Sequence, residues 1–178
     1  VFDVRAAEAP SAIQTGLSVT NNTLENKRFK ATLDANGDIA SLFDKANGRE
    51  VLSAPARLEM MEDTPREWPA WNIDWSDWSK PPKDAVKGPA EIKIIEAGPA
   101  RVALEVTRHH GFSTFKQVIS LAAGSPGDRL EFDTTLDWRE KETTLKAAFP
   151  ITAARDSASY NLKLGVVDRS NNNEKKYE

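Results

Sequence analysis

Four of the five tryptophans lie within residues 68–78, a stretch that also carries acidic and amide side chains and is followed by Pro81 and Pro82. An indole ring can pack against the C–H face of a pyranose, while carboxylates bind its hydroxyl groups. We therefore expect Trp71, Asp74 and Trp75 to contact a sugar. The alternative is that these rings plug the end of a sheet core or meet another domain, because tryptophan is usually largely buried.

The remaining residues offer little catalytic or metal chemistry. His109 and His110 are adjacent on a predicted strand, so their side chains should point to opposite faces and cannot easily bind one metal ion. Residues 34–38 have the acidic character of a calcium loop, but Gly37 is misplaced and no closing glutamate follows, which favours a hairpin turn. The chain has no cysteine. We expect no catalytic residue, no metal site and no cofactor in this chain.

Charge and hydropathy exclude two kinds of partner. The net charge is −3, and lysine and arginine are spread among the acidic residues, so no basic stripe is available for nucleic acid. No apolar run is long enough to span a membrane as a helix. The sequence does not fix the compartment; we expect a soluble protein of a bacterial cytoplasm or periplasm.

Side-chain alternation indicates an all-β protein. Residues 29–33 and 39–43 alternate around a turn at Asn36 and Gly37, and residues 102–106 and 130–138 alternate in the same way. Another strand is expected within residues 160–167. Glycine and proline separate these strands, and no amphipathic helix exceeds about two turns, which predicts an antiparallel β-sandwich.

The two ends suggest how the chain is divided. We expect residues 1–16 to form a strand and linker from a preceding module, and residues 17–178 to form the β domain. Residues 169–178 show no apolar periodicity. The sandwich is therefore expected to be incomplete at its C-terminus, and its exposed sheet edges could pair in a homodimer.

A set of motifs in fixed order resembles the C-terminal β domain of family 38 α-mannosidases. The resemblance covers roughly residues 20–168, and its motifs are Leu24-Glu25-Asn26, Asn36-Gly37-Asp38-Ile39-Ala40-Ser41-Leu42, Asp44-Lys45, Gly48-Arg49-Glu50-Val51-Leu52, Pro69-Ala70-Trp71-Asn72-Ile73-Asp74, Asp128-Arg129-Leu130-Glu131-Phe132, Asp137-Trp138-Arg139-Glu140 and Leu145-Lys146-Ala147-Ala148-Phe149-Pro150. One departure is Arg139, where members of the family often carry histidine.

The resemblance implies that the chain is the N-terminal part of a galactose-mutarotase-like supersandwich. It also implies a parent enzyme that hydrolyses terminal α-mannosides with retention of configuration, and that holds zinc in a separate catalytic domain. The partners would be that catalytic domain, in the same polypeptide, and α-mannoside glycans. The chain alone would be inactive, and residues 68–78 would border the sugar pocket.

Two other functions fit the same residues. The chain could be a stand-alone carbohydrate-binding module that uses the tryptophans as a stacking platform. It could also be a purely structural module between domains, without any contact to sugar.

Overall fold

The computed structural model describes residues 13–170. Within them lie fourteen strands, a four-residue α-helix and a three-residue 3₁₀ helix. In chain order they are β1 (Ser18–Val19), β2 (Thr23–Glu25), β3 (Phe29–Leu33), β4 (Ile39–Asp44), β5 (Arg49–Glu50), β6 (Arg57–Glu62), α1 (Trp75–Trp78), β7 (Asp84–Ala85), β8 (Glu91–Ala97), β9 (Arg101–His110), β10 (Ser113–Ala122), η1 (Ser125–Gly127), β11 (Glu131–Asp137), β12 (Thr143–Ala148), β13 (Ser157–Asn161) and β14 (Val166–Ser170).

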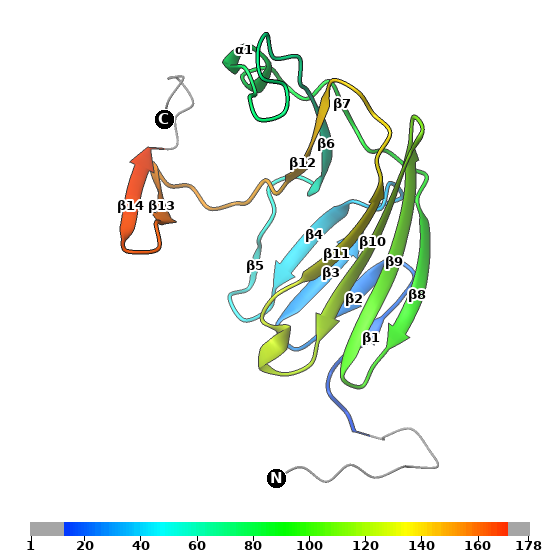
Figure 1. Cartoon of the computed structure of the whole chain (residues 1–178). Coiled ribbons are helices and arrows are strands. Elements are labelled where there is room, and N and C mark those ends of the chain that lie inside the picture. The colour runs from blue at the N-terminus through cyan, green and yellow to red at the C-terminus, as the bar shows by residue number, and fades with distance from the viewer. Residues whose placement is uncertain (1–12, 171–178) are drawn as a thin grey trace.

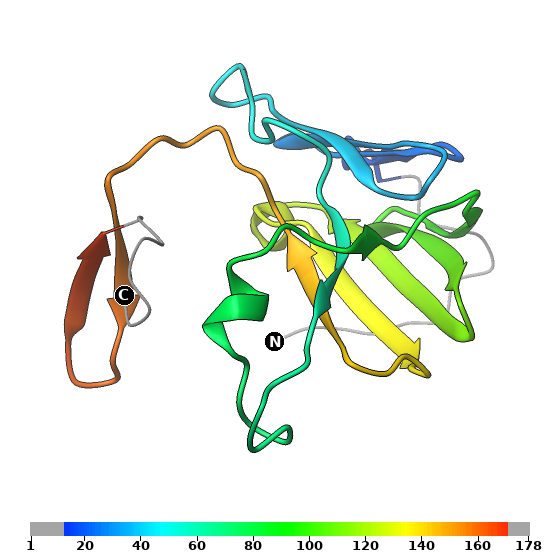
Figure 2. The same ribbon diagram turned by 90° about the horizontal axis from the view of Figure 1, so that it is seen from above.

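Two antiparallel sheets face each other, as Figures 1 and 2 show. The first sheet has the order β1-β2-β3-β4-β5 and the second has the order β11-β10-β9-β8. A third, smaller sheet with the order β12-β6-β7 continues from one end of the sandwich. The predicted antiparallel β-sandwich is confirmed, and no helix in residues 13–170 is long and apolar enough to cross a membrane.

The main core lies between the first and second sheets because alternate side chains of each strand point inward. Ala31 and Leu33 from β3 meet Leu104 and Val106 from β9 and Ile119 from β10, and all five are at most 2% exposed. Burying one such leucine or isoleucine contributes about 1.5–3 kcal/mol. A second cluster, around Phe115 and Met60, joins the second sheet to the third.

The turn between β3 and β4 is the hairpin that the sequence predicts. The Asp34 carboxylate accepts hydrogen bonds from the backbone N–H groups of Asn36 and Asp38, at 2.8 and 3.0 Å. Gly37 has a φ of +79°, which glycine adopts without steric cost. A Cβ at that position would lie 2.5 Å from Cγ1 of Val106, so the turn also packs tightly on β9.

The prediction of one further strand within residues 160–167 is wrong. The chain instead turns back at residues 162–165, where the N–H of Leu162 donates to the carbonyl of Gly165 and Lys163 has a φ of +69°. The resulting hairpin of β13 and β14 stands apart from the sandwich (Figures 1 and 2). Alternation alone missed the turn because Gly165 was the only residue there typical of one. The predicted strand and linker fall mostly in residues 1–12, which lie outside the described residues, as do residues 171–178.

Candidate functional site

The tryptophan stretch belongs to a long connection between β6 and β7, residues 63–83, which we call the tryptophan loop. It carries α1 and projects beyond the sandwich at the end where the third sheet lies (Figure 1). The side chain of Trp71 is 82% exposed and that of Trp68 is 64% exposed. These two rings therefore do not plug the core of the described residues, whereas their contact with another domain stays a prediction.

All three predicted site residues line one hollow of the tryptophan loop. Trp71, Asp74 and Trp75 surround a space of about 600 Å³. Its other lining residues are Trp68, Asn72 and Ser76, which belong to the stretch 68–78 that the sequence singles out, and Arg66 and Glu67, which sequence reasoning missed although they lie directly before that stretch. The hollow thus combines indole rings with both donors and acceptors of hydrogen bonds.

Hydrogen bonds within the loop hold the Asp74 carboxylate in place. Oδ2 of Asp74 accepts from the backbone N–H of Arg66 at 3.1 Å, and Oδ1 accepts from the side-chain amide of Asn72 at 2.9 Å. The backbone N–H groups of Trp71 and Asn72 both donate to the carbonyl of Trp68, at 3.1 and 2.9 Å. Because a carboxylate oxygen has two lone pairs, Asp74 keeps the capacity to accept from a ligand.

Asp77 has a structural role in the same loop. It is 3% exposed, and its Oδ2 accepts from the N–H and the hydroxyl of Thr64 at 2.7 and 2.9 Å. Its Oδ1 accepts from Nζ of Lys80 at 3.3 Å. The donors on Thr64, followed by the Lys80 cation, hold the pKa of Asp77 below its usual value. Asp77 therefore ties the start of the loop to α1 as a carboxylate.

Two contacts fix α1 on the third sheet. Nζ of Lys146, from β12, lies 4.6 Å from the centroid of the Trp78 ring, within the range of a cation–π interaction. Nζ of Lys80 forms an ion pair of 2.7 Å with Glu62, the last residue of β6. The rings of the loop are thus presented from a platform that the sheet supports.

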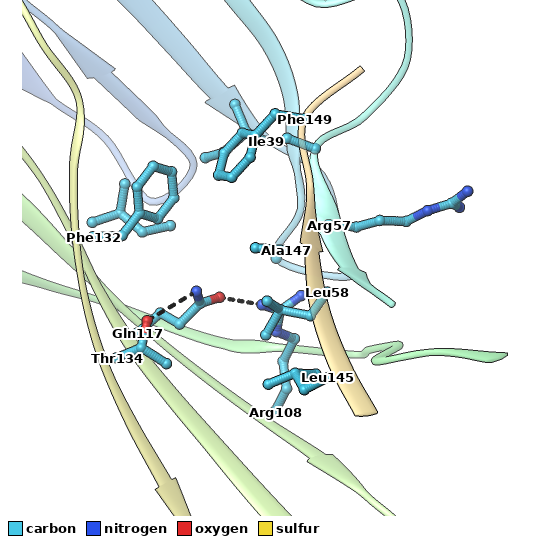
Figure 3. Close-up of a pocket in the computed structure, with 13 residues that line it drawn as sticks. Ile39, Arg57, Leu58, Arg108, Gln117, Phe132, Thr134, Leu145, Ala147 and Phe149 are labelled. Carbon is cyan, nitrogen blue, oxygen red and sulfur yellow. Dashed lines mark hydrogen bonds between the residues drawn. The ribbon is translucent and has the colours of Figure 1, made fainter. Parts of the chain in front are cut away.

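A separate hollow of about 300 Å³ lies between β11 and the pair β12 and β6 (Figure 3). Its lining is mostly apolar, with a buried polar network at its base. Nη1 of Arg108 donates to Asp38 at 2.7 Å, and Nη2 donates to Oε1 of Gln117. The amide of Gln117 donates to the hydroxyl of Thr134 at 3.3 Å.

Burial dominates the electrostatics of this network. It raises the pKa of Asp38 and lowers that of Arg108, and the attraction between the two opposite charges partly offsets both effects. Sequence reasoning missed the pair, although Arg108 continues the alternation of Val102, Leu104 and Val106 and so had to point inward.

No group of three histidine, aspartate or glutamate side chains in residues 13–170 is arranged to hold a metal ion. Nδ1 of His109 lies 3.1 Å from the hydroxyl of Thr114, on the neighbouring strand. The side chains described here do not fit a zinc site, and the zinc expected in a catalytic domain stays a prediction.

Comparison with known proteins agrees with the resemblance. Residues 24–178 match the family model described as "Glycosyl hydrolases family 38 C-terminal domain". Alpha-mannosidase G of Dictyostelium discoideum is 28% identical over 157 residues, covering 82% of this chain and 14% of the relative. Alpha-mannosidase 2C1 is 28% identical in both Mus musculus and Homo sapiens, covering 85% and 83% of this chain and 15% and 14% of those relatives.

The chain thus spans about one seventh of the length of these curated relatives. The match to the family model covers most of the sequence and both sheets of the sandwich. The chain therefore belongs to the family of glycosyl hydrolase family 38 C-terminal domains.

Proposed function

We propose that this chain is a non-catalytic β-sandwich portion of a retaining α-mannosidase, which hydrolyses terminal α-mannosides. Membership of the family and the names of the relatives support this proposal. Retaining glycosidases use one carboxylate as nucleophile and one carboxyl group as acid and then base. Asp74 and Asp77 are both engaged in holding the tryptophan loop. The reactive pair is therefore expected in the catalytic domain of the same polypeptide.

The tryptophan loop is the part of this chain proposed to border the sugar pocket. The observation that carries this role is the highly exposed Trp71 beside the positioned Asp74 carboxylate in one hollow. An exposed indole offers a flat apolar face, and the neighbouring polar groups can bind hydroxyls, which is the pairing that a pyranose requires. In this proposal Trp71 and Trp75 contact the ring of the sugar and Asp74 accepts from a hydroxyl group.

Substitution of Trp71 in the parent enzyme tests the proposal. Loss of a stacking contact of about 0.5–1.5 kcal/mol lowers kcat/KM by roughly 2- to 12-fold. We expect Trp71→Ala to fall in or above this range with an α-mannoside substrate. Phe112→Ala is the matched control, because Phe112 is an equally exposed aromatic side chain, at 87%, in the turn between β9 and β10. Equal activity losses in the two variants, at equal melting temperature, would remove the role of Trp71 at the site.

The exposed indole also supports the second candidate, a stand-alone carbohydrate-binding module. Isothermal titration of the 178-residue chain with mannose and with mannobiose separates the two functions. A loop that only borders the pocket of another domain should release no heat, whereas a binding module should bind mannobiose without its parent. A purely structural module would show neither sugar binding nor a specific loss of activity in Trp71→Ala.

A further inference from the structure

A second hollow adjoins the tryptophan loop, between α1 and the strands β6 and β12 of the third sheet, and we call it the sheet-side hollow. It encloses about 320 Å³, within the range of about 300–1,000 Å³ that is typical of small-molecule sites. Trp75 lines both this hollow and the one that contains Trp71 and Asp74. The two spaces therefore share one indole ring.

The strands give the sheet-side hollow a donor and an acceptor of hydrogen bonds. Glu59 of β6 and Lys146 of β12 are paired in register, so their side chains share one face, and both line the hollow. Oε1 of Glu59 accepts from Nε of Arg57 at 3.3 Å, which leaves the carboxylate with lone pairs for other donors. The Lys146 ammonium lies over the ring of Trp78 and forms no ion pair within residues 13–170, so its N–H groups remain available.

The tryptophan loop gives the same hollow flat apolar groups. Trp75 and Trp78 are the first and last residues of α1, and both contribute their indole rings. The rings of Pro81 and Pro82 follow them in the lining. Trp78 remains 41% exposed although Lys146 lies over its ring. Apolar rings beside a carboxylate and an ammonium group suit a ligand that has both C–H faces and hydroxyl groups.

The charges around the sheet-side hollow favour a neutral ligand over an anion. Lys80 also lines it, but its Nζ lies 2.7 Å from the Glu62 carboxylate and 3.3 Å from that of Asp77. Glu59 offsets the charge of Lys146 in the same lining. No cation is therefore left over to bind a phosphate or sulfate group, whereas a sugar needs only hydrogen bonds and an apolar face.

We propose that the sheet-side hollow binds the second sugar residue of an oligosaccharide substrate, beside the terminal mannose that the hollow of Trp71 and Asp74 takes. Lys146 donates to one hydroxyl group of this second residue, Glu59 accepts from another, and Trp75 contacts both sugar rings. This inference rests on the proposed function of the tryptophan loop and extends it, because it names the substrate class: glycans with at least two linked pyranoses.

A comparison of two substrates in the full-length parent tests the second sugar. One is an α-mannobiose that the parent cleaves, and the other is α-mannosyl fluoride, whose leaving group is a single atom and cannot fill a second hollow. Lys146→Met keeps an apolar stem but removes the donors. It should lower the ratio of kcat/KM for mannobiose to kcat/KM for the fluoride by at least about fivefold, the effect of one hydrogen bond of about 1 kcal/mol.

The matched control is Lys116→Met, on β10. Lys116 is paired with Glu105 at 3.3 Å and lines neither hollow, so this change should leave the ratio as it is. If Lys146→Met lowers kcat/KM equally for both substrates, Lys146 only supports α1 and the second sugar is refuted. The proposed function survives that result as long as Trp71→Ala lowers kcat/KM for both substrates more than Phe112→Ala does. If Trp71→Ala does not, the proposed function fails, and this inference with it.

A cysteine at Ser79 covers the case in which Lys146→Met does not fold. Ser79 is exposed, lines the sheet-side hollow and makes no side-chain hydrogen bond within residues 13–170. In folded Ser79→Cys parent, N-benzylmaleimide should attach and fill the hollow, and the ratio should fall at least about fivefold relative to the same protein before labelling. The native parent, treated in the same way, controls for other cysteines. Failure of the cysteine to react, or an unchanged ratio after complete labelling, would overturn the proposal.

Discussion

Removal of the Arg108 guanidinium should reveal how strongly the sandwich depends on the buried ion pair of Arg108 and Asp38. Arg108 and Asp38 are 2% and 7% exposed, and they are joined across 2.7 Å between residues 70 positions apart in the chain. In Arg108→Met the apolar stem is largely kept, but the Asp38 carboxylate stays buried without a cation. Truncating one partner of a buried ion pair typically costs about 3–5 kcal/mol.

An independent estimate gives the same magnitude. Two unit charges about 4 Å apart attract each other by about 4 kcal/mol at an effective dielectric constant of about 20. Gln117 also loses the donor to its Oε1, which adds about 1 kcal/mol. We therefore expect Arg108→Met to lower the free energy of unfolding of the 178-residue chain by about 4 kcal/mol, measured by urea unfolding followed by tryptophan fluorescence.

The double variant Arg108→Met with Asp38→Leu isolates the electrostatic part. Because it removes both charges, it should be more stable than Arg108→Met by about 2–3 kcal/mol. The single variant should also respond to pH. Burial already raises the pKa of Asp38, and loss of the cation raises it further, so the folded state binds a proton more readily than the unfolded state.

The destabilisation by Arg108→Met is therefore complete above the raised pKa of Asp38 and shrinks as the pH falls through it. For the double variant, the difference in free energy of unfolding from the native chain should not shrink in this way as the pH falls. A cost below about 1 kcal/mol for the single variant, or equal costs for the single and double variants, would refute the assignment of Arg108 and Asp38 as a coupled pair.

Two further predictions concern the turn at Gly37 and the anchor of the tryptophan loop. Gly37→Ala combines a positive φ with a Cβ only 2.5 Å from Val106, so it should lower the free energy of unfolding in urea by more than about 2 kcal/mol. Gly48→Ala is the control: Gly48 has a φ of +62° and open space around it, so the loss should be only about 1–2 kcal/mol. Asp77→Asn should loosen the tryptophan loop, which would be seen as greater quenching of tryptophan fluorescence by acrylamide. Because the pKa of Asp77 is lowered in the folded chain, the carboxylate stabilises the loop above about pH 4, and this stabilisation is lost as the pH falls through the folded-state pKa. Quenching in the Asp77→Asn variant should not change over that pH range.

Local patterning predicted the strands of the sandwich because each depends on side chains two residues apart. The inward row of β11 and the turn at Gly37 follow from such short-range spacing. The pairing of Arg108 with Asp38 could not be predicted, since it depends on how two sheets are laid against each other. The hairpin at residues 162–165 was missed because its turn has few residues typical of turns.

The sequence predicted some residues of the candidate site but not the contacts that hold it in place. The composition of residues 68–78 identified Trp71, Asp74 and Trp75, and the structure brings all three to one hollow. The part played by Thr64 was not predictable, because its bonds to Asp77 bridge thirteen residues of irregular chain. The binding of a sugar in this hollow stays a prediction.

The uneven exposure of the tryptophans gives the molecule an internal optical probe. Trp71 and Trp68 are largely in water, whereas Trp138 lies edge-on against the buried Phe115 with ring centroids 6.2 Å apart. Emission from the two exposed indoles should be red-shifted and easily quenched, and docking against another domain or a glycan would shift it towards the blue. Such docking could then be followed in real time without attaching a dye.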